Sequence, residues 1–427
     1  YRKHPLGLFS RDVMPMKCVL ALCACWAILF TADAAAVPTS ATVLYESEAW
    51  SIIDGIDESG VAWVTFEDGL QKTGWGVLNV ETNPAFEDEV QAYGAGAAEG
   101  YVTAPHIYNA FHNLAPNVFG NSSAPSAAVQ EFLNSQESWL IAQVDAAGGN
   151  DPFWRQTNYI YQQYLGLSFG YGKAVDAGYA KALPSFAFQM LNGVGDLFDI
   201  IPACDKEKQI RWLDLRQEEA EALHQKQGHC SGLIKVTGDM SDLFLAHSSW
   251  FTYSNTDRIF KHYNFQFKDV STSSRKISFS SYPGFLESLD DFYLLESGLT
   301  WTQTSNGVIN QTIYEHVQPE SLLAWQRVRI ASAMASDGEE WFQIFSRNHS
   351  GTYANQYMST YAFLRRLVFT LTNFLSPSPL STRSSRKHEL VRTEYSIKKW
   401  YFVGRGGSPR LSGGKRYDRS NPNGLLG

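Results

Sequence analysis

The order of helix-like and strand-like segments constrains the fold of this chain more than any other feature of its sequence. Short apolar runs separated by turn residues occupy 43–80 and predict strands joined by hairpins. Apolar residues then recur at helical spacing through 87–115, 124–145 and 151–172. Residues 210–227 predict an exposed amphipathic helix, with apolar positions at Ile210, Leu213, Ala220 and Leu223.

Strand-like runs return after Cys230, at 233–236, 243–246, 276–281 and 292–301. The first two of these runs are separated by a turn signal at Gly238-Asp239. Helices concentrated before Cys230 and strands concentrated after it predict an α+β sandwich.

Charge divides the chain near residue 358. The whole sequence holds 35 Lys+Arg and 43 Asp+Glu in 427 residues, but 359–427 alone hold 13 basic and only 3 acidic residues. The preceding body is therefore strongly acidic, which argues against a nucleic-acid partner because such proteins present a basic surface. Most basic runs are solvated segments, so 359–427 predict a tail without a fold of its own.

The N-terminal region resembles a secretory signal peptide. Lys17 precedes an apolar run over 19–30, and small residues follow up to Ala36. An apolar run of this length is too short to span a bilayer as a helix. We therefore predict an upstream extension followed by a signal peptide at about 14–36, and a secreted or lysosomal protein.

Cysteine usage after the signal peptide is sparse. Only Cys204 and Cys230 remain, which is too few for a disulfide framework. The two cysteines either pair with each other, or one of them is a working thiol. Three N-glycosylation sequons fit passage through the secretory pathway, and they begin at Asn121, Asn310 and Asn348.

One cysteine lies in a motif that is typical of nucleophiles. Residues 228–232 read Gly-His-Cys-Ser-Gly, which matches the thiol version of the nucleophile elbow. An elbow requires a strand before the nucleophile and a helix after it, whereas here a helix-like segment precedes Cys230 and a strand-like segment follows. A buried structural cysteine is the simplest alternative.

The reversed order suits an N-terminal nucleophile. In such an enzyme the thiol attacks the carbonyl carbon that precedes it, and after hydrolysis of the resulting ester the cysteine carries a free α-amine. This amine titrates near ~7.7–8.0 and can act as the local base. Nucleophile and base then belong to one residue, as in the threonine–amine pairing.

Long stretches of the chain resemble the phospholipase B-like family (the lamina ancestor group). The matching segments run in order over about 40–358. They are Gly96-Ala-Ala-Glu-Gly-Tyr-Val-Thr103, Asp151-Pro-Phe-Trp154, Cys230-Ser-Gly-Leu-Ile-Lys235, Asp242-Leu-Phe-Leu-Ala-His247-Ser-Ser-Trp250, Arg258-Ile-Phe-Lys-His-Tyr263, Phe279-Ser-Ser-Tyr-Pro-Gly284, Asp290-Asp-Phe-Tyr293, Ser297-Gly-Leu299, Ala335-Ser-Asp-Gly338 and Asn348-His-Ser-Gly-Thr-Tyr-Ala-Asn-Gln-Tyr357.

This resemblance implies an N-terminal-nucleophile hydrolase with an αββα four-layer sandwich, matured by a self-cut between His229 and Cys230. It also implies that His247, Trp250 and Ser305 line the site, with Ser305 standing where the family has a threonine. Taken alone, His247 and Trp250 are more often core residues. Asp242 and Arg258 fit the pattern too, and a structural ion pair is the alternative explanation for them.

With the resemblance, the chain divides into four segments and lacks the second half that family members have. These are the extension and signal at 1–36, an N-terminal hydrolase fragment at 37–229, the nucleophile-bearing fragment at 230–358 and the divergent tail at 359–427. Family members continue with a second half that completes the sheets and supplies an Asn to the site. We therefore expect the sandwich to be incomplete at its C-terminus, and 359–427 to be a translated intron or a frame-shifted exon.

The function implied by the resemblance is hydrolysis of fatty-acyl ester bonds in phospholipids, with Cys230 as the nucleophile. An amidase acting on N-acylated lipids or peptides and an inactive truncated secreted glycoprotein are the alternatives. The expected partner is a phospholipid or another acylated substrate, with a membrane surface only as its source. No cofactor and no metal are expected, because the pairs His106/His112 and His224/His229 lack further ligands for a tetrahedral site. The sequence makes no prediction of oligomeric state.

Overall fold

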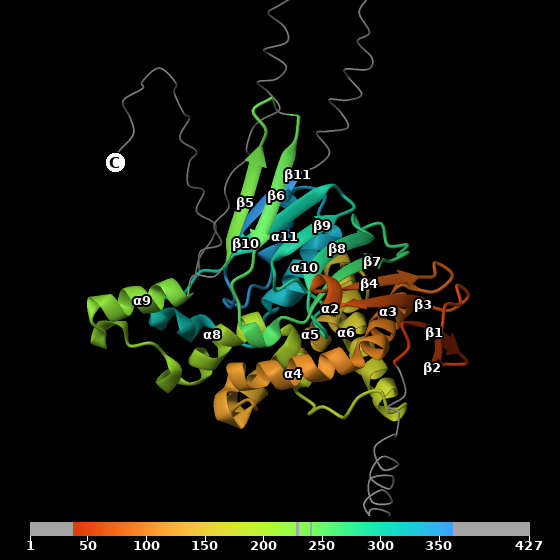
Figure 1. Cartoon of the computed structure of the whole chain (residues 1–427), viewed down its shortest axis with the longest axis horizontal. Coiled ribbons are helices and arrows are strands. Elements are labelled where there is room, and N and C mark those ends of the chain that lie inside the picture. The colour runs from red at the N-terminus through yellow and green to blue at the C-terminus, as the bar shows by residue number, and fades with distance from the viewer. Residues whose placement is uncertain (1–36, 228–229, 240, 362–427) are drawn as a thin grey trace, which may run out of the picture. The chain divides into compact units, whose positions relative to one another are not determined.

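The computed structural model describes residues 37–227, 230–239 and 241–361, and Figure 1 shows its helices and strands. Contacts divide the chain at Val37, so the architecture described here is that of the unit beginning at Pro38. The predicted signal peptide, residues 228–229 and the tail beyond 361 lie outside the described residues.

A nine-stranded sheet, hereafter the main sheet, runs through this unit. The strand order is β11-β10-β9-β8-β7-β4-β3-β1-β2, and every neighbouring pair is antiparallel except β4 and β7, which are parallel. The strands are β1 (Ser40–Glu46), β2 (Ala49–Asp54), β3 (Ala62–Gly69), β4 (Trp75–Thr82), β7 (Arg258–Asn264), β8 (Lys276–Ser281), β9 (Phe292–Leu295), β10 (Leu299–Thr304) and β11 (Gln356–Tyr361).

Most helices lie in the long connection between β4 and β7. Parallel neighbours require such a crossover, because the chain must return to the starting end of the sheet. The helices in the connection are α3 (Asp88–Val102), α4 (Ala104–Phe119), α5 (Ala127–Ala147), α6 (Pro152–Asp176), α7 (Ala187–Asn192), α8 (Val194–Cys204) and α9 (Gln217–Gln227), and outside it are α2 (Leu70–Thr73), α10 (Ala324–Met334) and α11 (Gly338–Phe345).

Short polar side chains mark where several of these helices begin. Ser126 accepts a hydrogen bond from the third residue beyond it at the start of α5, and Asp151 caps α6 immediately before Pro152. Asp337 caps α11 by accepting from two backbone N–H groups. These caps satisfy N–H groups that have no partner within the helix.

Helix α3 packs on the main sheet, and α6 packs on α3. The contact between the two helices is made by glycines: a Cβ atom on Gly96 would lie 1.9 Å from the carbonyl oxygen of Gln163, and one on Gly166 would lie 2.0 Å from that of Tyr93. Only glycine allows two helix backbones to approach so closely. The glycines of α3 therefore lie inside a helix and allow it to pack closely against α6.

A short hairpin forms a separate two-stranded sheet. Strands β5 (Ser231–Val236) and β6 (Leu243–Ser248) are antiparallel, with Gly232 opposite His247. The face carrying Gly232 turns toward the main sheet, because a Cβ on Gly232 would meet Met358 of β11 and Thr302 of β10. Figure 1 shows the hairpin running beside β10 and β11.

The opposite face of the hairpin is exposed. Leu233 on β5 and Phe244 on β6 leave 52% and 54% of their surfaces accessible to solvent. Their positions alternate with those of Gly232 and His247, as the period of two in a strand requires. The hairpin thus packs by one face only.

Helices and a mixed sheet in one unit confirm the α+β prediction. Several boundaries differ from the prediction, and residues 359–361 of the predicted tail form the end of β11. The helix predicted over 210–227 begins only at Gln217, and Leu213 lies fully exposed in a short 3₁₀ turn before it. The run 292–301 is two strands, because Gly298 adopts a positive φ of 85° and turns the chain between β9 and β10. Within the described ranges, no helix combines the length and apolarity needed to cross a membrane.

Candidate active site around Cys230

Cys230 lies immediately before β5, and α9 ends three residues earlier in the chain. A helix before the cysteine and a strand after it reproduce the order that excludes a nucleophile elbow. The backbone of Cys230 has a φ of 76°, a left-handed value that is unusual for a residue with a side chain. Residues held in this way cost about 1–3 kcal/mol and concentrate at functional sites.

Two further reactive side chains lie close to the thiol. One ligand-type atom from each of Cys230, His247 and Asp291 lies within 4.8 Å of the other two. His247 comes from β6, and Asp291 comes from the turn that enters β9. The hairpin and the main sheet therefore each contribute to this cluster, hereafter the Cys230 cluster.

The main chain of Gln303 on β10 orders the cluster. Its carbonyl oxygen lies 2.9 Å from Nε2 of His247, so this nitrogen donates the hydrogen bond and carries the proton. Its N–H donates to the carbonyl oxygen of Asp291 at 3.2 Å. One residue of β10 thus fixes both the imidazole and the acidic residue, and Nδ1 of His247 keeps a free lone pair.

Burial dominates the acid–base properties of the cluster. It raises the pKa of the Cys230 thiol, although the backbone N–H of Trp250 and the Ser249 hydroxyl oppose the change. Burial lowers the pKa of His247, and the Gln303 carbonyl opposes it. The pKa of Asp291 is raised well above its ordinary value, first by burial and then by nearby groups that include Cys230. All three groups are therefore shifted toward their neutral forms.

Of the two other predicted site residues, Trp250 acts on the thiol through its backbone, and Ser305 makes no hydrogen bond to Cys230 or His247 among the described residues. The backbone N–H of Trp250 lowers the pKa of the Cys230 thiol, whereas the Trp250 indole is 57% exposed. Ser305 follows β10 directly and is half-buried. No hydrogen bond in the described part of the chain joins Ser305 to Cys230 or His247, so its predicted place in the site stays a prediction.

Cys204 and Cys230 are both free, so the possibility that they pair with each other was wrong. The suggested ion pair between Asp242 and Arg258 is also wrong, since no ion pair among the described residues joins them. Arg258 instead places its guanidinium 4.7 Å from the centre of the Trp75 ring. The guanidinium ion of Arg258 is therefore stabilised by the face of the Trp75 ring and not by the Asp242 carboxylate.

The other predicted residues are placed as follows. The sequon residues Asn121, Asn310 and Asn348 are all exposed, as a glycan would require. His106 lies between Asp257 and Asp68, with its Nδ1 2.8 Å from Asp257. The ring of His112 packs against Tyr108 and Phe111, and the side chains of His224 and His229 lie outside the described residues.

Asp291 and the main chain of Gln303 were not among the residues predicted for the site. Asp291 belongs to the Asp290-Asp-Phe-Tyr293 segment, where two acidic residues stand between Leu289 and an aromatic pair. Acidic residues in such apolar surroundings are the available signal, because burial of a carboxyl without function is costly. Both are in fact buried, with 3% and 1% of their surfaces exposed.

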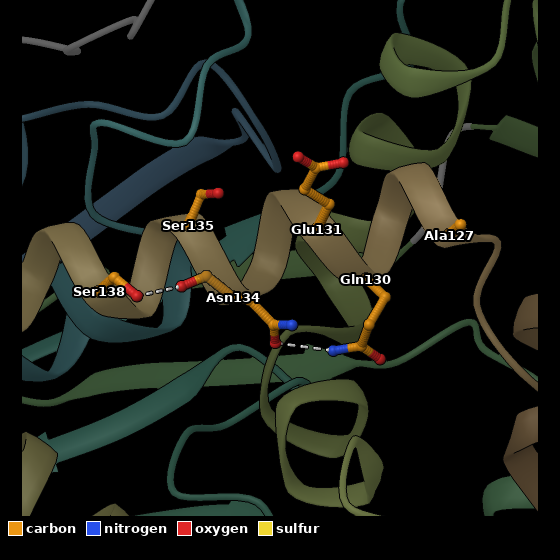
Figure 2. A pocket seen from close by; sticks show the side chains of 6 residues that line it. All are labelled: Ala127, Gln130, Glu131, Asn134, Ser135 and Ser138. Carbon is orange, nitrogen blue, oxygen red and sulfur yellow. Dashed lines mark hydrogen bonds between the residues drawn. The ribbon is translucent and has the colours of Figure 1, made fainter.

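A hollow on the outer face of α5 holds none of the predicted site residues. Figure 2 shows it along one helix, with Gln130 and Ser138 each hydrogen-bonded to Asn134. Its lining is mainly small and amide side chains, namely Ala127, Gln130, Glu131, Asn134, Ser135 and Ser138. A surface lined by one helix offers no converging catalytic groups, so the Cys230 cluster remains the candidate active site.

The described unit is an α+β protein in which a thiol, an imidazole and a carboxyl group lie together at one site. The family model for phospholipase B matches residues 62–364, and the chain belongs to this family. It is 42% identical over 368 residues to phospholipase B-like 1 of Rattus norvegicus, covering 84% of this chain and 64% of the relative. It is 42% identical to phospholipase B-like 1 of Bos taurus, covering 76% of this chain and 60% of that protein.

A third relative carries the unqualified name phospholipase B. This protein of Crotalus adamanteus is 41% identical over 320 residues, which cover 74% of this chain and 57% of the relative. The chain thus spans about three fifths of the length of the curated relatives that it matches.

Proposed function

We propose that this chain is the nucleophile-bearing part of a phospholipase B-like acyl hydrolase, in which Cys230 becomes an N-terminal nucleophile by self-cleavage. The observation that carries the proposal is the Cys230 cluster at the start of β5, with a left-handed backbone at the cysteine itself. The family membership supports the hydrolase class.

The proposed self-cut proceeds through a thioester. The Cys230 sulfur attacks the carbonyl carbon of residue 229, a C–S bond forms and the C–N bond of the peptide breaks. The thiol proton passes to the leaving nitrogen, and water then hydrolyses the thioester. The products are a carboxyl group on residue 229, a free thiol and the α-amine of Cys230.

His247 is the proposed base for this first step, because the α-amine is still part of a peptide bond. Its Nε2–H is committed to the Gln303 carbonyl at 2.9 Å, so Nδ1 is the nitrogen that can accept a proton. The backbone N–H of Trp250 and the Ser249 hydroxyl, which both lower the pKa of the Cys230 thiol, would support the thiolate.

After the cut, the α-amine replaces His247 as the base nearest to the sulfur. The same thiol then attacks the acyl carbon of an ester, the alcohol departs with the proton, and water releases the fatty acid. The proposed substrate is a phospholipid, because relatives carry the name phospholipase B. No cofactor enters these steps.

The proposed architecture is the N-terminal-nucleophile sandwich. The main sheet and the β5–β6 hairpin are two separate sheets in contact near Gly232 and Thr302, which supports a two-sheet interior. The exposed apolar face of the hairpin, with Leu233 and Phe244, supports a further covering layer in the mature enzyme. We also propose a secreted or lysosomal location with glycans on Asn121, Asn310 and Asn348.

Intact mass and N-terminal sequencing of the full chain, expressed with its leader, test the self-cut. We expect a fragment that begins Cys-Ser-Gly-Leu-Ile-Lys. Cys230→Ala should abolish this fragment, and Cys204→Ala is the matched control that should retain it. A wild-type chain that stays uncut, or a Cys230→Ala chain that is still cut, would overturn the mechanism.

Hydrolysis of a phosphatidylcholine in mixed micelles, compared with hydrolysis of an N-acyl amide of equal chain length, tests the substrate class. We expect fatty-acid release from the ester. Preferential cleavage of the amide would replace the phospholipase proposal with an amidase.

A further inference from the structure

We propose that the Cys230 cluster is also a binding site for a single divalent transition-metal ion of the zinc type, and that the bound ion blocks the nucleophile. Cys230, His247 and Asp291 would each supply one ligand, and the fourth position would hold water. The metal-binding part of the proposal stands on its own, whereas the blocking effect rests on the proposed function.

The donor set fits zinc. Thiolate, imidazole and carboxylate are its three protein ligand types, and three protein ligands with one open position form a stable site. Bond lengths of about 2.0–2.3 Å place neighbouring ligands roughly 3.5 Å apart in a tetrahedron. One ligand-type atom of each residue lies within 4.8 Å of those of the other two, so the three side chains converge on one place.

The hydrogen bond of His247 is the arrangement that zinc-binding histidines share. Such a residue binds the metal through one ring nitrogen and donates its other N–H to a carboxylate or a backbone carbonyl. Nε2 of His247 donates to the carbonyl oxygen of Gln303 at 2.9 Å. This bond fixes the tautomer that leaves Nδ1 free for a metal.

Asp291 supplies an independent reason to expect a cation. Its side chain is 1% exposed, and its Oδ2 atom has no hydrogen-bond partner. A buried polar atom without a partner is costly, and in native proteins it calls for an explanation such as a missing ion. The Gln303 N–H donates to the backbone carbonyl of Asp291 at 3.2 Å, which fixes the backbone that carries this carboxyl group.

The neighbourhood of the cluster also favours positive charge. Asp290 is 3% exposed, its Oδ1 accepts from Tyr282, and its Oδ2 has no partner. Buried carboxyl groups beside the thiol make the site attractive to a divalent cation.

A metal at this position would stop the proposed chemistry. A thiolate bound to zinc is a weaker nucleophile because it donates electron density to the metal, and a His247 that binds the ion through Nδ1 no longer has a nitrogen that can accept a proton. After a self-cut, the α-amine and the sulfur of Cys230 would form a chelate with the same ion. We therefore expect zinc to inhibit both the self-cut and turnover.

Titration of the full chain with Co²⁺ tests the metal site without any need for activity, because thiolate ligation to Co²⁺ gives a charge-transfer absorption band. We expect one Co²⁺ per chain with this band, and displacement of Co²⁺ by Zn²⁺. Cys230→Ala should remove the band, and Cys204→Ala should keep it. Asp291→Asn and His247→Gln should weaken binding by ~10-fold or more. Asparagine tolerates the positive φ of Asp291, which protects the fold in that variant.

Protection of Cys230 from iodoacetamide by Zn²⁺, read by peptide mass spectrometry, is a second measurement that needs no cut. A wild-type chain that binds no Co²⁺, or a band that survives Cys230→Ala, would overturn the metal site. A chain that binds Co²⁺ through Cys230 yet never yields a fragment beginning at Cys230 would uphold the metal site and overturn the self-cut. Cleavage at Cys230 without any metal binding would uphold the self-cut and overturn the metal site.

Discussion

Lys261 of β7 and Glu99 of α3 form an ion pair in complete burial, with Nζ 2.6 Å from Oε1 and neither side chain exposed. Tyr263 donates a second hydrogen bond to Glu99, at 2.6 Å from Oε2, and Lys261 also donates to the carbonyl oxygen of Phe285. The pair ties the helix layer to the strand at the centre of the main sheet. The contribution of this ion pair to stability depends on both partners being present, because a lone buried charge has no solvent to stabilise it.

Glu99→Gln should therefore lower the free energy of unfolding by about 3–5 kcal/mol. Lys261 would remain buried without its counter-ion, and this cost dominates. The double variant Glu99→Gln with Lys261→Met should be less destabilised than Glu99→Gln alone. Urea unfolding followed by tryptophan fluorescence measures both. Glu219→Gln, which breaks an exposed pair with Arg216, is the control and should leave the midpoint unchanged. Equal losses in the single and double variants would contradict the role of the unpaired charge.

Gly166→Ala should destabilise the contact between α3 and α6. The new Cβ would lie 2.0 Å from the carbonyl oxygen of Tyr93, and a backbone atom cannot move aside as a side chain can. Overpacking of this kind costs about 1–3 kcal/mol or more. Gly172→Ala in the same helix is the matched control, since nothing lies within 4 Å of its Cβ position. That variant should gain up to about 1 kcal/mol from helix propensity. Thermal unfolding of both variants checks the contrast, and equal midpoints would contradict it.

His106 should make stability depend on pH above the ordinary imidazole range. Burial lowers the pKa of His106, but the hydrogen bond and charge of Asp257 and the charge of Asp68 outweigh it, so the net shift is upward. A pKa raised on folding gives stabilisation that is complete below about 6.5 and is lost as the pH rises through the folded value. His106→Gln should remove this loss in unfolding curves collected from pH 5 to 8.

His262→Gln is the opposite control for that experiment. Burial lowers the pKa of His262, so the unfolded chain binds a proton at this residue more readily than the folded protein does. Stability therefore increases with pH until the ring is neutral in both states. Removing it should change the slope in the direction opposite to His106→Gln. Identical slopes in the two variants would show that the Asp257 contact does not hold a charged imidazole.

Asp196 should make stability depend on pH in a more acidic range than His106 does. Its carboxyl is fully buried, and burial raises its pKa to about 6 although the Ala324 N–H and Thr352 hydroxyl oppose the change. Stability from this group is complete below about 4 and falls as the pH rises toward 6. Asp196→Asn keeps an acceptor for the Ala324 N–H and should abolish this fall. The difference at pH 7 is on the order of 3 kcal/mol in favour of the variant. Unfolding midpoints at pH 4 and pH 7 measure it, and an unchanged difference between them would contradict the assignment.

Local pattern was enough to place most of the elements near the site. The strand at 276–281 has the bounds that its sequence predicts, and the turn between the hairpin strands falls at Gly238-Asp239. The position of Cys230 between a helix and a strand was also correct. These features depend on residues close together in the chain, where spacing of apolar side chains and turn residues acts directly.

Two boundaries failed because local pattern carries too little information there. The apolar positions Ile210 and Leu213 match helical spacing, but the helix forms only from Gln217. Gly298 divides the run 292–301 because its positive φ turns the chain between β9 and β10. Spacing alone does not reveal whether a glycine continues a strand or turns it.

Local pattern was sufficient for the helix-before, strand-after placement of Cys230, and the family resemblance supplied the candidacy of His247. The groups that meet the thiol could be identified only from the fold. Asp291 reaches it from the turn before β9, and the main chain of Gln303 holds both His247 and the backbone of Asp291. Contacts of this kind arise from the register between strands that lie far apart in the chain. A backbone carbonyl or N–H can play its part with almost any side chain, so it leaves no trace in the amino-acid sequence.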